Sequence, residues 1–315
     1  MSDVFRVLSP GPLTTVQDAG RTAFQHMGVP VSGALDRYGL QVANWLVGND
    51  GGCAVLEATL VGPRLEVLAE ADMALTGAAS ALTINGLPAP GWTSQRVRPG
   101  DIVDTGVPEN GCRSYLAVGG GIDVPPVMGS RATYLGGRLG GVEGRALTAG
   151  DVLRRGPARL LDRPRRLPWF PLYGGEVILR AVVGPQDRYF RSALATFFDS
   201  PFTVSAQANR MGYRLEGPAL VREADAPASI VSEPIVAGNV QVPADGKPII
   251  LLNEQTLGGY AKIATVISSD LFKVAQAKPG DTVRFVAVTV DQAGAIAHQW
   301  ATFLGDIQTL LAAGG

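Results

Sequence analysis

The segment NEQTLGGYAK, residues 253–262, places polar side chains directly after the apolar run PIILL, residues 248–252. Polar residues that follow a buried strand are well placed to enter a cleft, and the glycine pair lets the backbone approach a ligand closely. Amide, hydroxyl, phenol and ammonium groups can together orient a small polar molecule. We therefore expect ligand contacts from Gln255, Thr256, Tyr260 and Lys262.

A second candidate is NRMGYRLEGP, residues 209–218, which carries Arg210, Tyr213 and Arg214. If this segment is a strand, its period of two places both arginines on one face. Two guanidinium groups on one face could clamp a carboxylate, because guanidinium and carboxylate pair in a bidentate manner. The alternative is a solvated strand edge without a ligand.

The stretch 11–49 mixes glycine and proline with polar residues and contains His26, one of only two histidines. Two histidines make a histidine triad or a multi-histidine metal site hard to build, so we expect no metal site. His26 is a candidate ligand contact, whereas His298 suits a helix surface. Arg131, in the glycine-rich segment 129–141, is a candidate anion contact.

These side chains need a scaffold of strands. Turns containing Gly-Asp and followed by alternating apolar residues recur in RPGDIVDTG, TAGDVLRRG and KPGDTVRFV. Together with many other short apolar segments between turn residues, they predict sheets that close or pack on one another. Apolar spacing predicts helices over 36–46, 186–198, 268–277 and 291–312.

The pattern as a whole predicts a mainly β fold with a few helices, arranged as two barrel-like domains. We place the first domain at 1–160 and the second, with its C-terminal helix, at 176–315. The segment 161–175 is rich in proline and arginine and is predicted to be a linker.

Composition narrows the class of protein. A net charge of −1 and a pI of about 6.2 give no electrostatic case for binding nucleic acid or an anionic membrane. Cys53 and Cys112 are the only cysteines, too few for a disulfide framework, and suit buried thiols. With no signal-peptide pattern and no apolar run of about 18 residues, we expect a cytoplasmic protein.

The sequence also resembles a known family along nearly its whole length. The similarity runs through GPLTTVQDAGR, GVPVSGALDR, ANWLVGN, LEATLVGPRL, YLAVGGGIDVPPVMGSRATYLGG, RMGYRLEGP, GNVQVPADGKPIILL and QTLGGYAKIATV. It resembles the biotin-dependent carboxyltransferase-like family, whose members include the C-type subunit of 5-oxoprolinase, the KipA-type antagonist of a kinase inhibitor and part of urea amidolyase. This resemblance implies two cyclophilin-like β-barrel domains and a KipI-like partner.

For bacterial members, the resemblance implies the role of the C-type subunit in ATP-dependent 5-oxoprolinase, which opens 5-oxo-L-proline to L-glutamate. The enzyme is completed by a KipI-like subunit of the B type and by a third subunit of the A type, and ATP with Mg acts at the level of the complex. A lactam resists water, and phosphorylation of its oxygen would make the carbonyl carbon electrophilic. Catalytic roles are expected for Arg210, Gln255 and Lys262. Substrate-binding roles are expected for Gln17, His26, Ser32, Asp36, Arg131, Tyr213, Arg214, Gln241, Thr256 and Tyr260.

Two other functions stay open at this point. One is a carboxyltransferase component that uses carboxybiotin on a separate carrier; the chain has no biotin-attachment sequence, so no covalently attached biotin is expected. The other is a non-catalytic KipA-type regulator that binds a KipI-type kinase inhibitor. The family sequence QTTGGYPK reads QTLGGYAK here, and Leu257 and Ala261 could alter ligand specificity.

Overall fold

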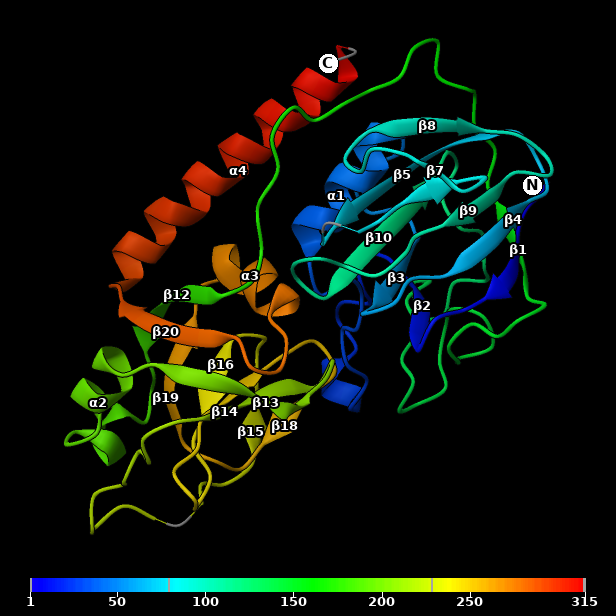
Figure 1. Ribbon diagram of the computed structural model, residues 1–315. Helices are drawn as coiled ribbons and strands as arrows, with labels where there is room; N and C mark the ends of the chain where they lie inside the picture. Colours follow the sequence, from blue (N-terminus) through cyan, green and yellow to red (C-terminus); the bar gives the residue numbers. More distant parts are fainter. Residues whose placement is uncertain (1, 79, 228, 314–315) are drawn as a thin grey trace. The chain divides into compact units, whose positions relative to one another are not determined.

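The computed structural model describes residues 2–78, 80–227 and 229–313 (Figure 1). Contacts between Cα atoms divide the chain into two compact units. Unit 1 consists of Met1–Thr22, Ser32–Tyr173 and Phe303–Gly315, and unit 2 consists of Ala23–Val31 and Gly174–Thr302. The boundary after Tyr173 falls inside the segment 161–175 that the sequence analysis assigns to a linker.

Unit 1 contains two antiparallel sheets, with strand orders β11-β1-β4-β9-β6-β7 and β2-β3-β10-β5-β8. Apolar side chains from both sheets form one core, in which Phe5, Leu65 and Leu153 meet Leu75 and Leu116. The strands are β1 (Ser2–Ser9), β2 (Leu13–Gln17), β3 (Val55–Thr59), β4 (Arg64–Val67), β5 (Ala71–Gly77), β6 (Thr83–Ile84), β7 (Leu87–Pro88), β8 (Ser94–Val97), β9 (Ile102–Asp104), β10 (Arg113–Val118) and β11 (Val152–Arg155).

Helix α1 (Arg37–Leu46) packs on β5 and β10 of this unit. Asp36 is its N-cap, and the Asp36 Oδ1 atom accepts a hydrogen bond of 2.7 Å from the Gly39 amide. Gly39 lets the helix approach the sheet closely, because a Cβ atom there would lie 2.8 Å from the Tyr115 ring. The prediction that Asp36 begins a helix is confirmed.

A buried polar network fixes the chain that leads into α1. The Tyr115 hydroxyl donates to Glu57 Oε2 at 2.9 Å, and the same carboxylate oxygen accepts from the Leu35 amide at 2.9 Å. The Asp36 amide donates to the Tyr115 oxygen, also at 2.9 Å. Burial, followed by the charge of Glu57, raises the pKa of Tyr115 well above its ordinary value, so the phenol stays protonated and remains a donor.

Unit 2 is a closed barrel of seven strands in the order β12-β19-β16-β17-β14-β13-β20. Parallel pairing of β12 with β20, from Glu176 opposite Thr282 to Ala181 opposite Ala287, closes it. The barrel strands are β12 (Glu176–Val183), β13 (Phe202–Ala208), β14 (Gly212–Glu216), β16 (Asn239–Gln241), β17 (Ile249–Leu251), β19 (Lys262–Val266) and β20 (Thr282–Ala287). The mainly β prediction is confirmed, and in this unit the barrel is complete.

Short helices pack on the barrel. The predicted helix 186–198 is divided into η2 (Asp187–Phe190) and α2 (Leu194–Asp199), and Phe197 of α2 stacks on Phe285 at 4.3 Å between ring centroids. The predicted helix 268–277 is η3 (Ser268–Asp270) followed by α3 (Leu271–Gln276).

Helix α4 (Val290–Ala312) is the longest of the described helices. Its Trp300 stacks on Phe272 of α3, with 5.1 Å between the ring centroids.

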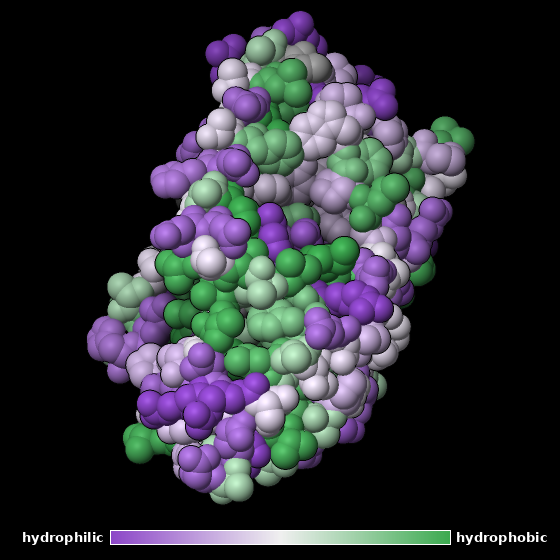
Figure 2. All heavy atoms as spheres, turned by 90° about the vertical axis from the view of Figure 1, so that its left-hand side faces the viewer, coloured by the Kyte–Doolittle hydropathy of each residue, from purple (hydrophilic) through white to green (hydrophobic). Residues whose placement is uncertain are grey.

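The surface mixes polar and apolar residues. Figure 2 shows apolar side chains gathered on the side of the molecule where Figure 1 labels α2 and β12. On the barrel itself, the outward-facing side chains of Ile178 and Val286 are exposed. Within the described ranges, no helix has the length and apolar character needed to cross a membrane.

Replacing Asp36 with alanine should destabilise the protein, because it removes the N-cap of α1. We expect a loss of about 1 kcal/mol in the free energy of unfolding, seen as a lower urea midpoint. Asp36→Asn is the matched control, since asparagine is an equally good N-cap. An Asp36→Ala protein with the wild-type midpoint would contradict the capping role.

Candidate functional site

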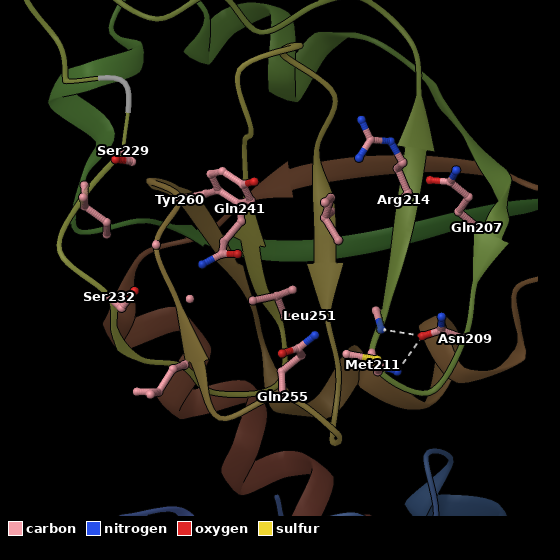
Figure 3. A pocket seen from close by; sticks show the side chains of 16 residues that line it. Gln207, Asn209, Met211, Arg214, Ser229, Ser232, Gln241, Leu251, Gln255 and Tyr260 are labelled. Carbon is pink, nitrogen blue, oxygen red and sulfur yellow. Dashed lines mark hydrogen bonds between the residues drawn. The ribbon is translucent and has the colours of Figure 1, made fainter. Parts of the chain in front are cut away.

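A pocket of unit 2 with a volume of about 690 Å³ lies against four barrel strands (Figure 3). Strands β13, β14, β16 and β17 supply its wall, and the segments 229–232 and 255–260 lie across from them. It is lined by Gln207, Asn209, Met211, Gly212, Arg214, Ser229, Ile230, Ser232, Gln241, Ile249, Leu251, Gln255, Leu257, Gly258, Gly259 and Tyr260. Carboxamide and hydroxyl groups therefore make up most of its polar lining.

Strand alternation decides which residues face this pocket. Tyr213, Val240 and Ile250 are paired across β14, β16 and β17, and their side chains are buried in the barrel core. Their neighbours point the other way, because successive side chains in a strand face opposite sides. Arg214 and Gln241 both lie opposite Ile249, so these three form a row along the outer face of the barrel. The pocket is thus on the outside of the barrel wall.

A small flap forms the opposite wall of the pocket. Strands β15 (Glu233–Pro234) and β18 (Leu257–Gly258) pair to make a two-stranded sheet. On either side of it, the Ile230 amide donates to the Gly259 carbonyl at 2.9 Å and the Ile235 amide donates to the Thr256 carbonyl at 3.1 Å. We call residues 229–236 and 255–260 the flap.

The flap is tied to the barrel by Lys262, the first residue of β19. Its ammonium group donates to Glu233 of β15, and the same carboxylate oxygen accepts from Gln186 Nε2 at 2.9 Å. Gln186 in turn accepts a hydrogen bond of 3.0 Å from the Lys262 amide. The hydrogen bond from Lys262 is the main cause that lowers the pKa of Glu233, so this carboxylate stays ionised at neutral pH.

A buried ion pair fixes the rim of the pocket. Arg210 Nε lies 2.6 Å from Glu254 Oε1, and the two side chains are only 4% and 7% exposed. Arg210 stands between the pocket residues Asn209 and Met211, while Glu254 precedes Gln255. The pair therefore joins two loops whose neighbouring residues face the pocket. Arg210 is placed to position these residues rather than to touch a ligand.

Arg214 is the single cation among the described residues that line the pocket, and its guanidinium group is paired with Asp245. Arg210 and Arg214 are thus held by two different carboxylates and do not form the carboxylate clamp considered from the sequence. A guanidinium group has five N–H donors, so Arg214 keeps donors that its single contact with Asp245 does not use.

Among the described residues that line the pocket, Gln241 has a buried side-chain atom without a hydrogen-bond partner. It is 4% exposed, and its Nε2 atom is buried without a hydrogen-bond partner among the described residues. An unsatisfied buried donor costs about 1–3 kcal/mol, so such groups are rare in folded proteins. Its position in the lining suggests that a ligand completes its hydrogen bonding.

Of the residues expected to contact substrate or to act in catalysis, the structure brings four together in this pocket: Arg214, Gln241, Gln255 and Tyr260. Lys262, Arg210 and Tyr213 are buried beside it, within the flap anchor, the rim ion pair and the barrel core. Thr256 belongs to the flap through its carbonyl group. His26 lies exposed in η1 (Gln25–Met27).

The other four expected residues belong to unit 1, where Gln17 Oε1 and Ser32 Oγ are buried without a hydrogen-bond partner among the described residues. Gln17 donates to Thr15 Oγ1 at 3.0 Å and to the Thr133 carbonyl at 3.1 Å, and Asp36 caps α1. Ser32 is fully buried with a φ of 54°. The Arg131 amide donates to Asp18 at 2.5 Å, while its guanidinium group lies 3.4 Å from Asp123.

Sequence reasoning missed several residues of the pocket wall, notably Gln207, Asn209 and the two flap serines, Ser229 and Ser232. Asn209 shapes the turn into β14, because its Oδ1 atom accepts from the Met211 amide at 2.8 Å and the Gly212 amide at 3.4 Å (Figure 3). The sequence does carry a signal for two of them. In AQAN, residues 206–209, alanine alternates with a carboxamide residue just before a turn that contains glycine.

The chemistry of this lining suits a small, polar, uncharged or singly negative ligand. Carboxamide and hydroxyl groups give directional hydrogen bonds, and Leu251, Ile249 and Leu257 supply apolar contact. Within the described residues, no three or more of His, Cys, Asp and Glu lie together in a way that could hold a metal ion.

Loss of the Lys262–Glu233 pair should loosen the flap. We expect Lys262→Met to lower the hydrogen-exchange protection factors of the Ile230 and Ile235 amides at pH 7, with barrel amides unchanged. Because the pKa of Glu233 is lowered by folding, its contribution is present above the ordinary glutamate value of about 4.3 and is lost as the pH falls through the folded value. The Glu233→Gln protein should lack this acid-induced loosening; equal pH dependence in both proteins would refute the anchor.

Breaking the rim ion pair should cost stability. Removing one partner of a buried pair leaves an uncompensated charge, so we expect Arg210→Met to lower the free energy of unfolding by about 3–5 kcal/mol. The double variant Arg210→Met with Glu254→Leu should recover much of this loss, because no buried charge remains. Urea titration of the three proteins measures both effects. A single variant as stable as the wild type would show that the pair is not needed.

Comparison with known proteins agrees with this architecture. The family model "Carboxyltransferase domain, subdomain A and B" matches residues 27–287. The C-type subunit of 5-oxoprolinase from Escherichia coli K12 is 40% identical over 294 residues, which cover 92% of this chain and 93% of that protein. The corresponding protein of Haemophilus influenzae is 32% identical over 299 residues, with 94% and 95% covered.

A solved structure shares the fold as well. The crystal structure of K. lactis urea amidolyase superposes with a TM-score of 0.91 at 32% identity, covering 98% of this chain and 20% of that much longer one. Similarity of both sequence and fold therefore extends over both units. The chain belongs to the family of carboxyltransferase domains with subdomains A and B.

Proposed function

We propose that this chain is the C-type subunit of an ATP-dependent 5-oxoprolinase, which opens 5-oxo-L-proline to L-glutamate in the cytoplasm. The observation that carries the proposal is the 40% identity to the C-type 5-oxoprolinase subunit of Escherichia coli along nearly the full length of both proteins. By contrast, the chain covers only 20% of the urea amidolyase chain. A relative of equal length supports a subunit of the same kind.

The pocket on the outer face of the barrel supports a small amide substrate. 5-Oxo-L-proline carries one lactam and one carboxylate, and the lining offers carboxamides, hydroxyl groups and the guanidinium group of Arg214. Polar groups that converge in a mixed polar and apolar pocket can orient such a molecule. Under this proposal Gln241, Gln255, Tyr260 and Arg214 bind substrate, while Arg210 and Lys262 hold the rim and the flap.

The same pocket does not fit a magnesium–nucleotide complex. A triphosphate needs several cations or backbone N–H groups, and the one cation in the described part of the lining is already paired with Asp245. We therefore assign ATP with Mg to the complex, in which the partners are a KipI-like subunit of the B type and a third subunit of the A type. No step through the nucleotide is derived on this chain.

A second function, transfer of a carboxyl group from carboxybiotin on a separate carrier, is favoured by one observation. The matching family model is that of a carboxyltransferase domain, and the fold is shared with urea amidolyase. A pocket lined mostly by carboxamides could also accept a ureido group.

Reconstitution separates the two functions. We expect glutamate and ADP to form from 5-oxo-L-proline and ATP when this chain is mixed with its A-type and B-type partners. Omitting this chain should abolish both products, because the proposed substrate pocket would be missing. Release of glutamate at the same rate without the chain would overturn the proposal, and decarboxylation of carboxybiotin by the mixture would favour the second function.

A further inference from the structure

We propose that Gln241 recognises the amide edge of a lactam ring and thereby selects lactams over similar rings that lack an amide. This inference rests on the proposed function for its choice of ligand. It makes one side chain responsible for ligand specificity. That side chain lies between the barrel wall and the flap and has a donor without a hydrogen-bond partner.

The first observation is the state of the Gln241 carboxamide. The side chain comes from the last residue of β16 and faces the pocket (Figure 3). The residue is only 4% exposed, and Nε2 has no hydrogen-bond partner within the part of the chain that the structure describes. This donor is shielded from water and unsatisfied by the protein, so a ligand can use it once the flap moves away from it.

The second observation is the space made for this group by the flap. A Cβ atom on Gly258 would lie 2.2 Å from Gln241 Nε2 and 3.0 Å from the carbon of the carboxamide. Any side chain at position 258 would therefore force the carboxamide to move. Glycine at this place in β18 lets the flap lie directly against the Gln241 carboxamide, so the flap must open for a lactam to pair with it.

The third observation is chemical complementarity. A lactam amide is held cis by its ring, so its N–H and C=O groups lie on one edge. A carboxamide also presents a donor and an acceptor on one edge, and the two can pair through two hydrogen bonds. A ring without an amide would leave the buried Nε2 unsatisfied, which is the strongest basis for discrimination between isosteric ligands.

The position of Arg214 fits the other end of such a ligand. Gln241 and Arg214 flank Ile249 in the row on the outer face, so their backbones are two strand spacings, or about 10 Å, apart. A ligand that spans Ile249 would place its lactam amide on the side of Gln241 and its ring carboxylate on the side of Arg214. The apolar side chain of Ile249 would lie under the ring.

The test is titration of 5-oxo-L-proline into this chain, with binding monitored by ligand-observed NMR. With the partners present, the KM for 5-oxo-L-proline is measured as well. We expect Gln241→Leu to weaken lactam binding by about tenfold or more, since it removes two hydrogen bonds but little volume. Gly258→Ala should have the same effect by displacing the carboxamide. Gln308→Leu is the matched control, because Gln308 is exposed on α4 and does not line the pocket.

A second probe, cyclopentanecarboxylate, has the ring and the carboxylate without the amide. Its affinity should be the same in the wild type and in Gln241→Leu. If Gln241→Leu does not fold, as judged by its thermal transition, Gln241→Met serves instead, because it keeps the length of the side chain but has no hydrogen-bond donor and no charge. Lactam affinity within twofold of the wild type in these variants, or no lactam binding by the wild type alone or with its partners, would overturn the inference.

The two proposals fail in different ways. Reconstituted 5-oxoprolinase activity with a KM unaffected by Gln241→Leu would leave the proposed function intact and refute the role of Gln241. Gln241-dependent lactam binding without any 5-oxoprolinase activity would refute the proposed function and retain the role of Gln241.

Discussion

Closure of the seven-stranded barrel is the constraint on which the pocket depends. The parallel pairing of β12 with β20 removes the last open edges, and each strand then has one face in the core and one outside. Because register is fixed around a closed barrel, the row Gln241, Ile249 and Arg214 cannot slip relative to its neighbours. The outer face becomes a rigid wall, and a small flap covers it.

Much of the polarity that makes this sequence conspicuous has a structural purpose. Glu57, Tyr115 and Asp36 build one buried network in unit 1, and Arg210 with Glu254 builds another pair at the pocket rim. Buried polar groups are costly unless satisfied, and once satisfied they fix one arrangement of loops. The residues that remain available for a ligand are mostly carboxamides, which carry no charge that burial would penalise.

The local features were the predictable ones. Apolar spacing located α1 and α4, the Gly-Asp turns located strands, and the run after PIILL pointed to Gln255 and Tyr260. A sequence pattern does not show which carboxylate pairs with a given lysine or arginine. Lys262 and Arg210 looked free for chemistry because their carboxylates, Glu233 and Glu254, come from segments far along the chain.

The identity of the closing strands also bears on how the protein folds as it is made. β12 is the first strand of the barrel in the chain and β20 is the last, yet they are direct neighbours. Contacts between segments so distant in sequence are formed late and slow folding. During synthesis on the ribosome, the edges of β12 and β13 that pair with β20 stay unpaired until β20 has emerged. We therefore expect the nascent second unit to bind chaperones that shield open strand edges.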